Sequence, residues 1–119
     1  MLETILEFRK GVLFVRLIGE LNKHTTGIFQ SEVTSTVIQN GIQNVVFNLE
    51  QLQDIDMKGM CLLLYHYEIC KKQKGKCYIC NVSNEGIYTK LKKNRIFNYL
   101  QDIENELSIL HEIQLEESV

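Results

Sequence analysis

The chain has 119 residues, of which 45% are hydrophobic, so it is long and apolar enough to fold as one domain around a packed core. Charged residues make up 24% and the formal net charge is -2, which excludes the strongly basic balance of a dedicated nucleic-acid binder. The longest apolar run, MCLLLY at residues 60–65, is too short to span a bilayer, and the first ten residues lack a signal-peptide core, so we expect a cytoplasmic protein without a membrane span.

The first two predicted elements are strands that form a hairpin. Residues 11–21, GVLFVRLIGEL, are rich in β-branched and aromatic side chains that alternate between two faces, which is typical of a strand. Residues 6–9 alternate in the same way, with Leu6 and Phe8 on one face and Glu7 and Arg9 on the other. A short turn at Lys10 and Gly11 would join the two segments, so we expect an antiparallel pair.

An amphipathic helix is expected after the hairpin. In residues 25–39 the apolar side chains recur every four positions, which predicts one buried helical face. Thr25 or Thr26 is available as the N-cap, and Asn40 and Gly41 follow as a stop signal.

A buried strand and a long helix come next. Residues 44–50, NVVFNLE, are a short apolar run bounded by polar residues, which is the pattern of a buried parallel strand. This run leads into DIDMKGM at residues 54–60. The apolar residues of 57–73 have helical spacing and the run has helical length, so it predicts a long helix that Gly75 closes.

The last third of the chain predicts short alternating elements. Residues 76–82, KCYICNV, predict a strand, residues 84–93 a short basic helix, and residues 96–100, IFNYL, a short strand. A final helix would bury one apolar face, made of Ile103, Leu107, Leu110 and Ile113.

Strands that alternate with helices predict an α/β fold with right-handed crossovers. We expect a mostly parallel sheet of four to five strands with an antiparallel hairpin strand at its edge, and about four helices. We expect a single domain over residues 1–114, followed by a short C-terminal tail, residues 115–119, as a candidate for disorder.

The four cysteines do not predict a metal or redox site. Cys77 and Cys80 have the spacing of a metal motif, but residues three apart in a strand point to opposite faces of the sheet. Cys61 and Cys70 lie nine apart on the predicted helix and also face opposite ways. We therefore expect buried, reduced thiols and no metal or other cofactor.

The sequence shows no constellation of catalytic residues. His24, His66 and His111 have no Cys, Ser or carboxylate at the spacing of a triad or a metal site, and the seven glycines are not gathered in a phosphate loop. Asp54 and Asp56 are a pair that could hold a cation, but Asp56 is better placed as the N-cap of the next helix. We expect a protein that is not an enzyme.

Charge is unevenly distributed along the chain. Eight of the 13 basic residues fall between positions 71 and 95, whereas residues 102–117 carry six acids and no Lys or Arg. An RNA or anionic-lipid patch would interleave aromatic residues with the basic ones, and this segment does not. The pattern favours a solvated basic face, and we expect no nucleic-acid partner.

Three stretches resemble the bacterial anti-sigma-factor antagonists of the STAS (sulfate transporter and anti-sigma antagonist) family. They are GVLFVRLIGELNKHT, NVVFNLEQLQDIDMKGM, and the order of elements through KCYICNVSNEGI. The family pattern has G-x-L-x-V-x-L-x-G-E-L-D-x-x-T, then a strand that ends in N-L-x-x-L-x-x-[IM]-D-S-S-G-L, then a long helix. The resemblance covers nearly the whole chain, and it implies the STAS fold with helices mainly on one face of the sheet.

The resemblance also implies a regulatory mechanism. In the family the second serine of D-S-S-G starts the long helix and is phosphorylated by a partner that is both a kinase and an anti-sigma factor. The unphosphorylated form binds this partner and frees the sigma factor. A phosphate at a helix N-terminus is locally favourable, yet it places about two negative charges in the binding surface and so blocks the complex.

The chain departs from the family pattern at the phosphorylated position. Asp56 and Gly59 match the motif, but Met57 and Lys58 stand where the two serines belong, and Met60 replaces the leucine. The other departures are Asn22 for the aspartate of G-E-L-D and Asp54 for an apolar residue. Without a hydroxyl at position 58, the usual serine switch is not expected here.

The resemblance therefore predicts a partner-binding surface of more positive charge. It consists of the loop after the second strand, the start of the long helix and the turn after KCYIC: Asn22, Lys23, His24, Thr25, Asp56, Met57, Lys58, Gly59, Met60, Cys61, Ser83 and Asn84. The expected partner is an anti-sigma factor or kinase-like ATPase with an acidic surface, and the protein itself is expected to be a monomer or weak dimer.

Two other functions remain open at this point. A degenerate STAS domain can serve as a scaffold in a sensory or signalling complex without a sigma factor. A STAS domain can also bind a small molecule or nucleotide, although the chain has no phosphate loop.

Overall fold

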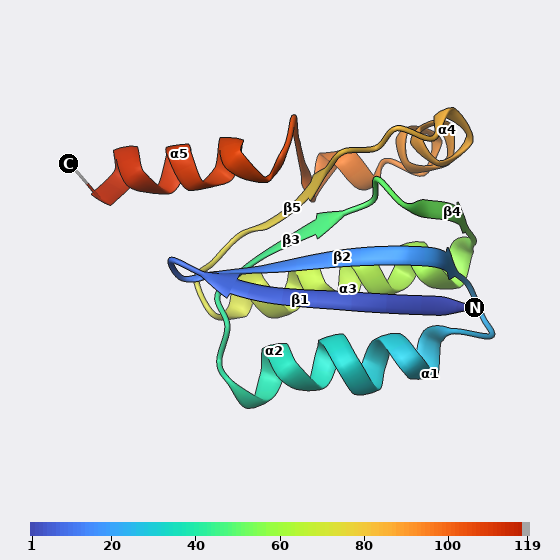
Figure 1. Ribbon diagram of the computed structural model, residues 1–119, viewed down its shortest axis with the longest axis horizontal. Helices are drawn as coiled ribbons and strands as arrows, with labels where there is room; N and C mark the ends of the chain where they lie inside the picture. The colour runs from blue at the N-terminus through green and yellow to red at the C-terminus, as the bar shows by residue number, and fades with distance from the viewer. Residues whose placement is uncertain (118–119) are drawn as a thin grey trace.

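The structure is a computed structural model that describes the backbone of residues 1–117 and the side chains of residues 1–112. Within this part, six strands form one mixed sheet in the order β1-β2-β3-β5-β6, and β4 pairs with one end of β2 (Figure 1). β1 is antiparallel to β2 and the other pairs are parallel, as the sequence predicts. The strands are β1 (Leu2–Arg9), β2 (Val12–Leu21), β3 (Asn44–Asn48), β4 (Leu52–Ile55), β5 (Cys77–Cys80) and β6 (Gln101–Ile103).

The helices also follow the predicted order. The first is continuous but contains a π-helical turn, and a 3₁₀ turn precedes β6. The helical elements are α1 (Thr26–Phe29), η1 (Gln30–Thr34), α2 (Ser35–Gln39), α3 (Met57–Lys72), α4 (Glu85–Lys93), η2 (Ile96–Asn98) and α5 (Glu106–Glu117).

Two apolar clusters fill the two faces of the sheet. The larger one joins the sheet to α1, α2, α3 and α4, so most helices lie on one face, as expected. The smaller one lies on the opposite face, where Ile109 of α5 packs against Phe14 and Val46. In Figure 1 α5 lies at the top of the view and α1 and α2 at the bottom. Cys77 belongs to the first cluster and Cys80 to the second, which confirms that their side chains diverge.

A histidine is enclosed in the larger cluster. His66 of α3 is 0% exposed, and its ring makes edge contacts with Phe29 and Phe47. Its Nε2 atom lies 2.8 Å from the hydroxyl of Thr34, at the end of the π-helical turn, and its Nδ1 atom has no hydrogen-bond partner. Burial lowers the pKa of His66 to about 4, so this ring is neutral near pH 7.

Two strands differ from the sequence prediction. β4 was not expected, because residues 52–55 were assigned to the connection before the long helix. Residues 96–100 were expected as a strand, but residues 96–98 form η2 and the strand β6 follows at Gln101–Ile103. A short apolar run fits either conformation, and here the burial of Ile96 and Leu100 explains the apolar pattern without a strand.

The buried face of the last helix also differs from the prediction. Ile103 lies in β6 rather than in α5, and Leu107 is 71% exposed. Ile109 is the buried residue, Leu110 is half-buried, and the side chain of Ile113 lies outside the described residues. α5 extends to Glu117, and residues 118 and 119 of the expected tail also lie outside the described part.

Two helix ends use different residues from those expected. Thr25 precedes α1, but its side chain does not cap that helix. After α3 the left-handed residue is Lys74, with φ of 62°, rather than Gly75. Gly75 is needed for space instead, because a Cβ atom there would lie 1.8 Å from the carbonyl oxygen of Gln43.

Candidate functional site

The loop after β2 and the start of α3 are held together by one carboxylate. Asp56 Oδ1 accepts a hydrogen bond from the backbone N–H of Gly59 at 2.9 Å, which confirms Asp56 as the N-cap of α3. Asp56 Oδ2 accepts another from the backbone N–H of Lys23 at 3.0 Å. The two stretches that the sequence analysis placed in one surface are therefore bonded to each other.

Hydrogen bonds to the Asp56 carboxylate also set its charge. Desolvation of the carboxyl raises its pKa, but the backbone N–H groups of Gly59, Lys23 and Lys58 outweigh this effect, so the pKa lies below its ordinary value. Asp56 is ionised at neutral pH and supplies the negative charge that a helix N-terminus favours. This charge offsets the unfavourable position of the Lys58 ammonium group beside the same helix end.

The loop itself is shaped by two polar side chains. Asn22 Oδ1 accepts from the N–H of His24, and the Thr25 hydroxyl accepts from the N–H of Asn22, each at 2.9 Å. The Thr25 hydroxyl also donates to the carbonyl of Glu20 at 2.9 Å. An aspartate at position 22 would offer the same acceptor oxygen, so Asn22 keeps the turn and removes one negative charge.

Gly59 is required by the close approach of α3 to the end of β2. A Cβ atom at this position would lie 2.4 Å from the carbonyl oxygen of Leu21. The N–H of Asp56 donates to that same carbonyl at 3.2 Å. The glycine of the D-x-x-G motif thus lets the helix start against the strand.

The side chains around this contact differ in exposure. Lys23, His24, Lys58 and Cys61 are exposed and Met57 is 58% exposed, whereas Met60 is buried in the core. The ammonium groups of Lys23 and Lys58 make no ion pair or hydrogen bond with the side chains that the structure describes. The surface therefore presents two ammonium groups without a direct partner beside an exposed apolar side chain.

The side chains of Ser83 and Asn84 bond to β4 and to the turn before it. Ser83 Oγ donates to the carbonyl of Glu50, and Asn84 Nδ2 donates to the carbonyl of Gln53. Asn84 Oδ1 also accepts from the N–H of Ile87 and so caps α4. Among the described residues, no hydrogen bond joins either side chain to the loop after β2 or to the start of α3.

Asp54 and Asp56 bond to different partners. Asp54 Oδ1 lies 2.7 Å from Lys90 Nζ, and this hydrogen bond lowers the pKa of Asp54. Among the described side chains, those of residues 1–112, no group of three or more His, Cys, Asp or Glu is arranged to hold a metal ion.

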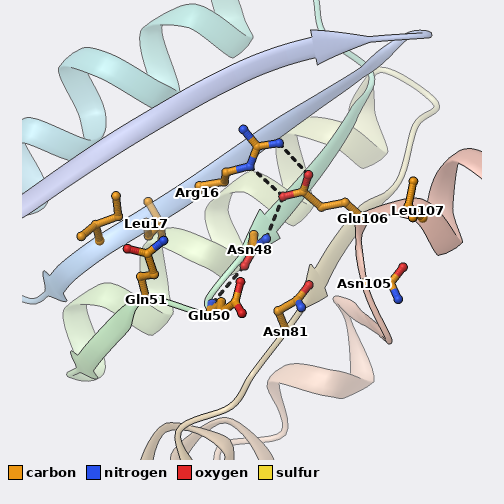
Figure 2. Close-up of a pocket in the computed structure, with 10 residues that line it drawn as sticks. Arg16, Leu17, Asn48, Glu50, Gln51, Asn81, Asn105, Glu106 and Leu107 are labelled. Atoms are coloured by element: carbon orange, nitrogen blue, oxygen red, sulfur yellow. Dashed lines mark hydrogen bonds and ion pairs between the residues drawn. The ribbon is translucent and has the colours of Figure 1, made fainter.

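A polar pocket on the opposite face was missed by sequence reasoning. A cavity of about 380 Å³ lies between β2, β3 and the start of α5, and Figure 2 shows Glu106 directed toward Arg16 and Asn48. Glu106 accepts from Arg16 Nε at 3.0 Å and from Arg16 Nη2 at 2.7 Å, and from Asn48 Nδ2 at 2.7 Å. The ion pair raises the pKa of Arg16 and lowers that of Glu106.

The only signal for this pocket in the sequence was Arg16, a charged residue in register with the buried Val12 and Phe14. Its partner lies 90 positions away, which no local pattern can reveal. Because Arg16, Asn48 and Glu106 satisfy one another, they attach α5 to the sheet.

The chain belongs to the STAS domain family, whose sequence model matches residues 3–108. Over 114 residues it is 27% identical to an anti-sigma F factor antagonist of Paenibacillus polymyxa, and this match covers 96% of the chain and 97% of the relative. No helix in the described part of the chain is long and apolar enough to cross a membrane.

Solved structures show the same fold. The unphosphorylated anti-sigma factor antagonist SpoIIAA matches 94% of the chain and 98% of its own length, with a TM-score of 0.74 and 19% identity. An anti-sigma factor antagonist from Mycobacterium paratuberculosis matches 96% of the chain and 95% of its own length, with a TM-score of 0.83 and 16% identity.

Proposed function

We propose that this protein is a non-enzymatic anti-sigma-factor antagonist that binds an anti-sigma factor or kinase-like partner and thereby releases a sigma factor. The binding surface consists of the loop at residues 22–25 and the start of α3 at residues 56–61. Support comes from the family, from the relative of Paenibacillus polymyxa, and from the bonding of these two stretches to each other.

The observation that carries this proposal is the double role of Asp56. Its carboxylate joins the N–H of Lys23 to the N–H of Gly59, so the loop and the helix start form one ordered surface. A partner that contacts both stretches meets them already in place, which reduces the entropy lost on binding.

We also propose that binding is not controlled by phosphorylation at position 58. Lys58 is exposed at the first turn of α3 and carries a positive charge where the family carries the phosphorylated serine. An amine in place of a hydroxyl cannot accept a phosphate through the same ester linkage. The protein is then permanently competent to bind, and an acidic partner surface suits Lys23 and Lys58.

Binding can be measured by calorimetry with the purified anti-sigma F factor of Paenibacillus polymyxa as the probe, in the presence and absence of ATP. We expect a complex whose Kd does not change with ATP, and no incorporation of phosphate from labelled ATP. Lys58→Glu should weaken the complex by about tenfold or more, because it reverses a charge within the interface. Lys72→Glu, at the far end of α3, is the matched control and should leave the Kd unchanged.

Three results would separate the parts of this proposal. Phosphate incorporation at Ser83 or Thr25 would contradict the absence of a switch while leaving the antagonist role in place. A Lys58→Ser variant that becomes a kinase substrate would show that the motif has lost only its acceptor. If neither the parent nor Lys58→Ser binds the probe, the antagonist role is wrong and the scaffold role is favoured.

A further inference from the structure

One edge of the sheet is a complete strand with no strand on its outer side, although α1 and η1 contact it and Thr4 Oγ1 donates a hydrogen bond to Glu32 of η1. β1 spans Leu2–Arg9, pairs with β2 along all eight of its residues, and ends the strand order of the sheet. In Figure 1 α1 and α2 lie below β1, on the side away from β2, and the described part of the chain places no strand there. Such an edge offers unpaired backbone donors and acceptors to another strand.

The hydrogen-bond pattern identifies which backbone groups of β1 point outward. Met1 accepts from the N–H of Glu20, which makes these two residues a hydrogen-bonded pair of the antiparallel ladder. Because such pairs alternate with non-bonded ones, the odd-numbered residues of β1 bond to β2 and the even-numbered ones face outward. The N–H of Gly19 donates to Gln51, away from β1, as this alternation requires. The outward groups belong to Leu2, Thr4, Leu6 and Phe8.

β1 carries the charged side chains Glu3, Glu7 and Arg9 but lacks other features that protect an edge strand. It contains no proline, no lysine and no β-bulge, and its register with β2 is unbroken. Ile5 is 43% exposed and Phe8 is 59% exposed. The edge is long, regular and partly apolar.

Charge favours a register centred on Leu6 over one centred on Ile5 when two such edges pair. When the outward-facing groups of two antiparallel β1 strands pair around a two-fold axis at Leu6, Glu3 of each copy lies opposite Arg9 of the other. Moving the axis to Ile5 would instead place Glu3 opposite Glu7, which is unfavourable on both sides of the axis. Glu3 and Arg9 are both exposed.

We propose that two copies of this chain form a homodimer by antiparallel pairing of β1 with β1, centred on Leu6. The pairing joins the two sheets into one continuous sheet. Thr4, Leu6 and Phe8 supply its backbone hydrogen bonds, and two symmetric Glu3–Arg9 ion pairs set the register. This inference does not depend on the proposed antagonist function.

Sedimentation equilibrium of the purified full chain tests the dimer, with charge variants that report the register. We expect a reversible monomer–dimer equilibrium, and we expect Glu3→Arg or Arg9→Glu alone to weaken the dimer by about tenfold, because each places two like-charged pairs across the axis. The double variant Glu3→Arg/Arg9→Glu should restore the dimer. Glu104→Arg makes the same change of charge at an exposed position in another part of the fold and should have no effect.

Phe8→Pro tests the backbone bonds separately from the charges. It removes an outward-facing N–H and leaves the ladder to β2 intact, so the dimer should weaken while circular dichroism of the monomer stays unchanged. A wild-type chain that remains monomeric up to about 1 mM, the concentration scale of a very weak complex, would overturn the proposal. A Glu3→Arg variant that dimerises as well as or better than wild type would also overturn it, because that result fits only another register or another surface.

Discussion

At the scale of single residues, Asp56 is the clearest link between sequence and site. Its role as an N-cap follows from its position before Met57 and from general capping preferences. Its carboxylate also accepts a hydrogen bond from the N–H of Lys23. These residues are 33 positions apart, so no local sequence pattern predicts this bond. The sequence therefore predicts the cap, while the tie to the loop depends on the tertiary fold.

Replacing Asp56 should cost more stability than replacing its neighbour. Asp56→Ala removes the N-cap of α3 and the bond to the loop, and we expect a loss of about 1–2 kcal/mol in the free energy of unfolding. Asp54→Ala breaks an exposed ion pair with Lys90 and a hydrogen bond from the backbone N–H of Ile55, but removes no helix cap, and should cost less than about 1 kcal/mol. Urea unfolding of both variants measures the difference, and equal losses would contradict the cap as the dominant contribution.

His66 should make the folded state sensitive to acid. Its pKa is lowered from 6.5 to about 4 by burial, so the unfolded chain binds the proton first as the pH falls. Stability is then complete above pH 6.5 and is lost as the pH falls toward 4, by about 2 kcal/mol between pH 7 and pH 5.

The variant His66→Leu isolates this effect. It should be less stable than wild type at pH 7, because the buried hydroxyl of Thr34 loses its partner, at a cost of about 1–3 kcal/mol. Its free energy of unfolding should change less than that of wild type between pH 7 and pH 5. Parallel curves for the two proteins in urea titrations at several pH values would contradict the role of His66.

At the scale of elements, length and regularity decide what the sequence can reveal. β2 and α3 are long and strongly patterned, and both are found where the sequence predicts them. β4 has only four residues, and its burial follows from pairing with one end of β2, so no periodicity marks it. The buried face of α5 was misassigned because Ile103, which lies in β6, fits the helical spacing by chance.

The attachment of α5 can be tested through its first residue. Glu106→Gln replaces a charge-assisted pair with Arg16 by neutral hydrogen bonds, and we expect α5 to become less stable by about 1–3 kcal/mol. The pKa of Glu106 is lowered in the folded protein. The stabilisation by its ionised carboxylate is therefore present above the ordinary pKa of a glutamate, and it is lost as the pH falls through the lowered pKa.

Hydrogen exchange of the amides at residues 108–112 measures this local stability. Exchange in α5 should accelerate in Glu106→Gln while exchange in β2 and β3 stays close to that of wild type. The control is Glu104→Gln, an exposed neighbour that should leave the exchange rates unchanged. Equal acceleration throughout the sheet would indicate that α5 unfolds only with the whole domain.

At the scale of the whole molecule, the alternation of strands and helices is sufficient to predict a mostly parallel sheet with an antiparallel edge. The same order places the loop after β2 and the start of α3 at one end of the sheet, since both follow parallel strands. The pocket on the other face depends on contacts between Arg16 and Glu106, which only the complete fold brings together.

The reactivity of the four cysteine thiols should reflect how the whole molecule is packed. Cys61 is exposed, whereas Cys70, Cys77 and Cys80 are buried on the two faces of the sheet. With a thiol reagent such as Ellman's reagent, we expect one fast-reacting thiol per native chain, and reaction of all four after denaturation. The variant Cys61→Ser should have no fast thiol, and a second fast thiol in wild type would contradict the buried positions.

The bond between Asp56 and Lys23 also has a kinetic consequence. Because the loop is already anchored to the helix end, an encounter with a partner need not wait for the loop to find its bound shape. Association would then be limited by diffusion and electrostatic steering. Differences in affinity between partners would come from the lifetime of the complex. In such a protein, hydrogen bonds within the free molecule affect how quickly two molecules recognise each other.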